Sequence, residues 1–200
     1  MPAKPIEFQR KIYQIKVTLL DTQPPIWRRL LVPSDMTLEQ LHNIIQSAMG
    51  WENCHLHDFR IGNKRYGKPD PEDRRMGLPA TGDERTARLF SVLGKVGAKA
   101  IYNYDFGDDW EHELLVEKIL PPEPGKPYPV CVSGQRNGPP EDCGGIMGFY
   151  SFLEAIRNPA HAEHAALLEW CGGDYDPDAF SIDDVNRRLA RVGRRGARQP

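Results

Sequence analysis

The densest group of reactive side chains lies between Tyr104 and Glu113, where five carboxylates and one imidazole occur. Gly107-Asp108 is typical of a tight turn between two alternating runs, so the segment predicts the tip of a β-hairpin. On a strand, Trp110 and His112 share a face. Carboxylates and a histidine at a loop tip can bind a divalent metal ion or exchange protons with a substrate. Acidic residues are also common turn formers, and this plainer interpretation is favoured for the hairpin alone.

The two histidines of His55-Leu56-His57 are the second candidate group. On a strand both imidazoles point to one side, a spacing that can bind a transition metal. Phe59 and Ile61 share that face, and zinc requires three or four ligands. Histidines at the edge of the core are therefore the favoured interpretation.

The third candidate is the loop of residues 138–145, whose glycines and prolines form tight turns that can present Glu141, Asp142 and Cys143 to a partner. Cys131 and Cys143 lack the spacing of a standard zinc module, and buried free cysteine is favoured for them. Phosphate-binding loops, serine-nucleophile elbows, HExxH motifs, paired CxxC motifs and dinucleotide fingerprints do not occur. The sequence alone assigns no metal ligand and no cofactor.

We predict that the hairpin at Asp105–His112 and the loop at Glu141–Cys143 face one shared pocket. Both segments combine turn-forming glycine with acidic side chains, and neither has the apolar pattern of a core segment. Crowded carboxylates repel one another unless a cation, a basic side chain or a shared proton relieves them. The candidate pocket consists of His57, Asp105, Asp108, Asp109, Trp110, His112, Glu141, Asp142 and Cys143.

The elements that must position these groups can be read from hydrophobic periodicity and capping residues. Alternation over 13–19 and a second run over 26–32 predict two paired strands. Thr37 and Gln40 form a capping box, and Gly50 is a C-terminal stop, so a helix is predicted over 37–49.

Three further strands are predicted at 55–61, 100–106 and 110–119, followed by a proline-rich extended connector and a long loop to residue 145. A short helix at 86–94 and helices at 148–156, at 160–171 and from Ser181 complete the set. Strands first and helices after predict an α+β fold: a mostly antiparallel β-sheet packed with one early helix and a C-terminal helical set. We expect a flexible N-terminal arm over 1–11, a single α+β domain over 12–192 and a basic C-terminal tail over 193–200.

Composition indicates an ordinary globular chain of 200 residues with a net charge of −2, which gives no overall attraction to nucleic acid or membrane. The N-terminus lacks the apolar stretch of a secretory signal, so we expect a cytoplasmic protein. The four cysteines are then expected to be thiols. Six arginines after residue 186 form a basic C-terminus that can make weak, non-specific nucleic acid contacts. No membrane partner is expected, and the ligand stays unknown.

Several of these segments together resemble the plasmid pRiA4b ORF-three-like family. They are Pro25–Arg29, His55–Phe59, Tyr104–His112, Pro139–Gly145 and Tyr175–Pro177. The resemblance spans residues 12–190 and implies an α+β fold, together with an occurrence on plasmids and beside or inside insertion elements. It implies no particular reaction, cofactor or catalytic residue.

Two classes of function are open. A non-enzymatic binding or accessory module associated with mobile genetic elements fits the missing catalytic motifs and is favoured. The alternative is a metal-assisted hydrolase or nuclease that uses a cluster of carboxylates and histidine. Its candidate residues are His57, Asp105, Asp108, His112, Glu141 and Asp142. Whether the protein is an enzyme is left undecided.

Overall fold

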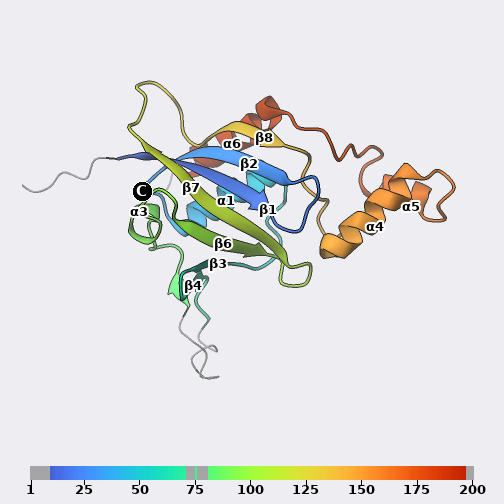
Figure 1. Ribbon diagram of the computed structural model, residues 1–200, viewed down its shortest axis with the longest axis horizontal. Coiled ribbons are helices and arrows are strands. Elements are labelled where there is room, and N and C mark those ends of the chain that lie inside the picture. Colours follow the sequence, from blue (N-terminus) through green and yellow to red (C-terminus); the bar gives the residue numbers. More distant parts are fainter. Residues whose placement is uncertain (1–9, 71–74, 76–80, 197–200) are drawn as a thin grey trace, which may run out of the picture.

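The computed structural model describes residues 10–70, 75 and 81–196, in which eight strands form one sheet (Figure 1). The strands are β1 (Ile12–Leu19), β2 (Ile26–Pro33), β3 (His57–Ile61), β4 (Lys64–Gly67), β5 (Gly82–Asp83), β6 (Lys99–Tyr104), β7 (Trp110–Leu120) and β8 (Val130–Gln135). Their order is β5-β4-β3-β6-β7-β1-β2-β8. Only the short β4–β5 pair among them is parallel. The fold is therefore α+β with a mostly antiparallel sheet, as the sequence predicts.

Helices cover one face of this sheet and also extend beyond it. The helices are α1 (Leu38–Met49), α3 (Leu89–Val92), α4 (Gly145–Arg157), α5 (His164–Trp170) and α6 (Ile182–Gly196). In Figure 1, α1 and α6 lie behind the sheet, whereas α4 and α5 project to one side. None of the described helices is long and apolar enough to span a bilayer.

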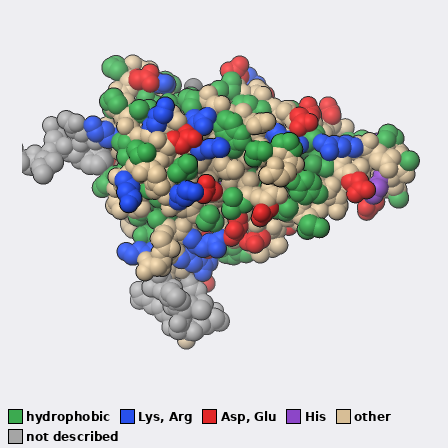
Figure 2. All heavy atoms as spheres, in the orientation of Figure 1, with side chains coloured by type: hydrophobic (Ala, Val, Ile, Leu, Met, Phe, Trp, Pro, Cys, Tyr) green, Lys and Arg blue, Asp and Glu red, His purple; other side chains and the backbone are tan. Residues whose placement is uncertain are grey.

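Alternation along the central strands produces the two faces of the sheet. Ile15 and Val17 of β1 and Leu114 of β7 are buried in one cluster with Leu41 of α1 and Leu189 of α6. The opposite face carries charged side chains of both signs (Figure 2). These charges pair across strands, as Arg29 with Glu117, Lys99 with Glu113 and Arg60 with Glu111. Such pairing is typical of a solvated sheet face.

The predicted caps of α1 are confirmed. The Gln40 amide donates to Thr37 Oγ1, and the Thr37 amide donates to Gln40 Oε1. Gly50 ends the helix with a φ of 96°, a conformation that glycine adopts without steric cost. The last turn contains no basic residue of its own. Two arginines from other elements approach it instead: Arg28 donates to the Ala48 carbonyl at 3.0 Å, and Arg188 donates to the Ser47 carbonyl at 2.8 Å.

Arg28 and Arg188 thus supply positive charge and hydrogen bonds to the C-terminal turn of α1. Arg28 is buried, and burial lowers the pKa of its guanidinium to about 10. Positive charge stabilises the carbonyl end of a helix. Arg28 therefore has a structural role, which accounts for one residue of the Pro25–Arg29 segment.

Several segments differ from the sequence expectation. Strand β8 pairs with β2 within the segment that was expected to be a loop. Gly134 allows this because a Cβ there would lie 2.5 Å from the Phe180 ring, and a glycine weakens the strand pattern of the sequence. The short strands β4 and β5 lie where the sequence predicts no strand, and β5 forms one edge of the sheet. Helix α6 continues through residues 193–196, so the expected start of the basic tail lies inside a helix. Residues 1–9 of the expected arm and 197–200 of the tail lie outside the described residues.

Candidate metal centre

Three segments that are far apart in the sequence meet beside the end of β6. The first joins α1 to β3, the second is the β6–β7 turn, and the third joins β8 to α4. Three hydrogen bonds link them: from the Asp105 amide to the Leu56 carbonyl (2.9 Å), from the Trp51 indole to the Pro139 carbonyl (2.9 Å) and from the Gly144 amide to Asp108 Oδ2 (3.1 Å). Each segment is therefore held directly by both of the others.

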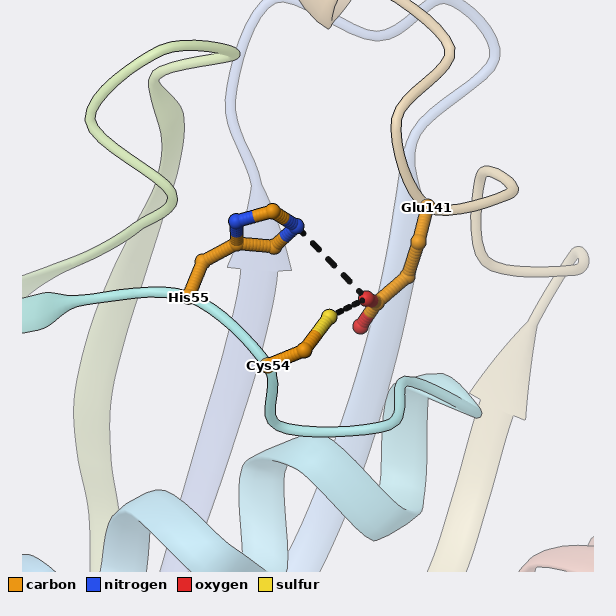
Figure 3. A group of neighbouring side chains, drawn as sticks. All are labelled: Cys54, His55 and Glu141. Carbon is orange, nitrogen blue, oxygen red and sulfur yellow. Dashed lines mark hydrogen bonds and ion pairs between the residues drawn. The ribbon is translucent and has the colours of Figure 1, made fainter.

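The meeting point contains a group of five side chains, here called the Cys54–His55 cluster: Cys54, His55, Asp105, Glu141 and Asp142. His55 Nε2 lies 2.9 Å from Asp142 Oδ1, 3.6 Å from Asp105 Oδ2 and 3.9 Å from Glu141 Oε2. The Cys54 thiol donates to Glu141 Oε2 at 2.6 Å. Figure 3 shows Cys54 and His55 directed at Glu141 from the segment that follows α1.

The donor atoms of this cluster form two overlapping triads. Those of Cys54, His55 and Glu141 lie within 4.8 Å of one another, as do those of His55, Asp105 and Asp142. His55 belongs to both triads, and its Nε2 is the nitrogen nearest the carboxylates. This nitrogen is buried and has no hydrogen-bond partner, although three carboxylate oxygens surround it. The three carboxylates compensate this nitrogen by ion pairing when the ring is protonated, and a cation bound among them would do the same for the neutral ring.

In two of the carboxylates, one oxygen accepts hydrogen bonds from groups outside the cluster and the other oxygen points into the cluster. Glu141 Oε1 accepts hydrogen bonds from the Glu52 amide at 2.8 Å and from the Tyr104 hydroxyl at 2.9 Å. Asp105 Oδ1 accepts from the Gly107 amide at 3.0 Å. The second oxygens, Glu141 Oε2 and Asp105 Oδ2, are the ones that lie within 4 Å of His55 Nε2. Metal-ligating carboxylates are oriented by outer hydrogen bonds in this way.

The electrostatics of the cluster favour a protonated thiol when no cation is present. The hydrogen bond to Glu141 is the main cause that raises the pKa of Cys54. Burial, followed by the hydrogen bond to Glu141, raises the pKa of Tyr104, so its hydroxyl stays a donor. Asp105 and Asp142 have φ values of 58° and 57°. Left-handed backbone at non-glycine residues is uncommon and concentrates at functional sites.

Among the sequence-predicted site residues, Asp105, Glu141 and Asp142 come together in this cluster. The β6–β7 turn and the 136–144 loop do converge there. Asp108 and Asp109 lie beside it and line a neighbouring cavity of about 290 Å³, together with Asp21 and Glu111. Asp108 also accepts from the Gly144 amide, and Asp109 from the Asn103 side chain at 2.7 Å.

Trp110 and His112 do not contribute to the cluster, because the face of β7 that they share is the buried one. His112 Nδ1–H donates to the Trp110 carbonyl at 3.0 Å, and burial lowers the pKa of His112 to about 4. Cys143 also stays outside the cluster. It is half-buried, and burial raises the pKa of its thiol to about 12.

The two histidines of His55-Leu56-His57 point to different places. Strand β3 begins at His57, so the alternation expected of a strand does not include His55. Leu56 between them is 66% exposed. His57 stacks on His42 with ring centroids 3.4 Å apart and contacts Glu84 Oε2 at 2.7 Å. His57 is therefore part of a separate buried group.

Cys54, His55 and Tyr104 complete the site, and the candidate pocket derived from the sequence omits all three. A signal for two of them was present, because Cys54-His55 follows closely after the Gly50 stop of a well-marked helix. Tyr104 has no such signal, since its position on β6 indicates a core residue.

Comparison with known proteins finds matches that cover most of the chain. The sequence profile described as "Plasmid pRiA4b ORF-3-like protein" matches residues 11–184. The chain is similar to "Uncharacterized protein y4hQ" of Sinorhizobium fredii, with 38% identity over 190 residues that cover 94% of this chain and 95% of that protein. It is also similar to the crystal structure of MM3350, a protein of unknown function from Methanosarcina mazei Go1. That comparison has a TM-score of 0.78 and 34% identity, and it covers 88% of this chain and 98% of that one.

Proposed function

The chain belongs to the plasmid pRiA4b ORF-3-like family, and we propose that it is a binding module for a divalent transition-metal ion, best matched by zinc. The observation that carries this proposal is the convergence of five donor side chains, with three carboxylates within 4 Å of His55 Nε2. In this proposal the module acts as a non-enzymatic accessory protein of mobile genetic elements, in keeping with the plasmid origin of the family name.

The distances are compatible with a small ion. Zinc binds thiolate, imidazole and carboxylate ligands at about 2.0–2.3 Å, which puts tetrahedral ligands roughly 3.5 Å from one another. The separations of 2.9, 3.6 and 3.9 Å between His55 Nε2 and the three carboxylates lie on both sides of that value. Small side-chain movements are therefore sufficient to surround an ion.

The donor types favour a transition metal over magnesium or calcium. Thiolate and imidazole select borderline ions such as Zn²⁺, whereas magnesium and calcium require mainly oxygen ligands. A cation also relieves the repulsion between the carboxylates of Asp105, Glu141 and Asp142. Binding requires loss of the Cys54 proton, which Glu141 now accepts as a hydrogen bond.

A metal-assisted hydrolase is the second candidate, and the exposure of Asp142 is the observation that favours it. Its side chain is 66% exposed beside the proposed ion, where a carboxylate can take a proton from an attacking water. The nuclease form has less support. Asp21, Asp108, Asp109 and Glu111 line the adjoining cavity, and their negative charge disfavours a phosphodiester substrate.

The metal proposal predicts one bound ion per chain. Chelator-stripped protein is titrated with Zn²⁺ by calorimetry and with Co²⁺ by absorption spectroscopy. We expect one site, with a thiolate-to-cobalt charge-transfer band from Cys54. The Cys54→Ser variant is expected to lose this band and to bind Zn²⁺ at least about tenfold more weakly.

The matched control is Cys171→Ser, because Cys171 donates to the Leu168 carbonyl outside the cluster. It should leave both the band and the affinity unchanged. Stripped wild-type protein that takes up neither ion, or a Cys54→Ser variant that keeps the band, would contradict the proposal.

A further inference from the structure

Helix α1 carries two buried polar residues on its core side. His42 and Gln46 are 3% and 2% exposed and lie one turn apart, among apolar neighbours such as Leu41 and Ile45. Residues four apart in a helix lie on the same face. Buried polar side chains at core positions need hydrogen-bond partners and destabilise the fold without them. Both of these residues reach the same partner, Asn53.

Asn53 is held by the helix at three of its atoms. Its amide donates to Gln46 Oε1 at 3.1 Å, and its side-chain Oδ1 lies 2.6 Å from His42 Nε2. Its side-chain amide donates to Asn43 Oδ1 at 3.3 Å. These contacts hold Asn53 at a φ of 62°, in the left-handed region.

A hydroxyl from β6 closes the network. The Gln46 side-chain amide donates to the Tyr102 hydroxyl at 2.9 Å, and that hydroxyl lies 2.8 Å from His42 Nδ1. One tautomer satisfies every group: Nε2–H of His42 donates to Asn53, and Nδ1 accepts from Tyr102. Burial lowers the pKa of His42 to about 3, in agreement with a neutral ring.

We propose that Asn53, clamped by His42 and Gln46, is the positioning residue that aims Cys54 and His55 into the metal site. This inference rests on the metal-binding function proposed above. Cys54 follows Asn53 directly, and its amide donates to the Tyr104 hydroxyl at 3.1 Å.

The same Tyr104 hydroxyl orients Glu141, so two tyrosines of β6 connect the clamp to the ligands. Tyr102 completes the hydrogen bonds of His42, and Tyr104 binds both Cys54 and Glu141. The backbone conformation at Asn53 thus sets the direction in which the next two side chains leave the loop. A clamp of this kind forms the thiol–imidazole half of the site before any ion arrives, and a preformed site costs less entropy on binding.

The test separates the side-chain clamp from the backbone conformation. Asn53→Gly keeps the left-handed φ without strain but loses the contacts of Oδ1 and Nδ2. Asn53→Asp retains an acceptor oxygen for His42. Asn43→Ala removes the long outer contact to Asn53, together with a local hydrogen bond from Asn43 to the Glu39 carbonyl within α1. Zn²⁺ affinity and the Co²⁺ spectrum are measured for each variant, and circular dichroism confirms that each is folded at the temperature used.

We expect Asn53→Gly to bind Zn²⁺ about 10- to 100-fold more weakly, as is typical when a partner of a metal ligand is lost. Its Co²⁺ charge-transfer band should weaken, since the band depends on the direction of the Cys54 thiolate. Asn53→Asp should restore most of the affinity, and Asn43→Ala should resemble wild type. A folded Asn53→Gly protein with wild-type affinity and spectrum overturns the positioning role while the metal site stands. Absence of binding by the wild type overturns both.

Discussion

Lowering the pH from 7 to 5 is expected to remove on the order of 4 kcal/mol from the free energy of unfolding, about 2 kcal/mol for each of two buried histidines. Burial lowers the pKa of His42 to about 3, with a contribution from His57, and that of His112 to about 4. In the unfolded chain both rings titrate near 6.5. Between pH 6.5 and the folded pKa values, these two histidines bind protons in the unfolded state but not in the folded state. The free energy of unfolding therefore falls as the pH is lowered through this range. Chemical denaturation at pH 7, 6 and 5 measures the loss.

His112→Phe isolates one of the two contributions, because phenylalanine fills a similar space and does not titrate. The loss between pH 7 and 5 should then shrink by about half. His161→Phe, which changes a histidine outside the core, should keep the full loss. The paired carboxylate of Glu117 contributes little to this loss. Arg29 lowers its pKa from 4.5 to about 2, so its stabilisation is lost only as the pH falls below about 4.5. Equal stability of the wild type at pH 7 and pH 5 would refute the prediction.

Gly138→Ala is expected to destabilise the fold by about 2–3 kcal/mol and to weaken metal binding more than tenfold. A Cβ at position 138 would lie 2.3 Å from the Met49 carbonyl oxygen at the end of α1. The carbonyl oxygen belongs to the backbone and the Cβ is attached directly to it, so neither atom can rotate away. The loop that carries Glu141 must therefore move away from α1. Thermal unfolding and Zn²⁺ titration measure the two effects.

Gly125→Ala is the matched control for this change. A Cβ there meets nothing within 4 Å, although φ is 77°. The variant should cost about 1 kcal/mol from the left-handed conformation alone and leave metal binding unchanged. If Gly138→Ala behaves like Gly125→Ala in both measurements, the close approach of the loop to α1 does not matter for the site.

Local signals in the sequence were sufficient for the elements that carry clear patterns. The capping box of Thr37 and Gln40 defines the start of α1, and alternation defines the central strands β1 and β7. Strand β8 was missed because prolines precede it and Gly134 interrupts it. Its place in the sheet depends on the edge that β2 offers, which is a tertiary effect that no local pattern contains.

The candidate site could be predicted only in part for a similar reason. Acidic residues and glycine in two turns indicated that Asp105 and Glu141 would meet, and they do. The direction of His55 depends on β3 beginning two residues later. The position of Asn53 depends on hydrogen bonds to His42 and Gln46, two buried polar residues of α1 whose partners lie outside the helix. Sequence spacing does not reveal such partners.

The meeting of three distant segments has a consequence for the order in which the protein matures. During synthesis from the N-terminus, Cys54 and His55 leave the ribosome well before the β6–β7 turn, and Glu141 and Asp142 leave last. Contacts between segments so far apart form late in folding, because long loops must close first. A nascent chain that ends before β8 contains the first hairpin and α1 but lacks two of the five donors. In this proposal, the complete cluster can capture an ion only after the segment that follows β8 has been made and β8 has joined the sheet.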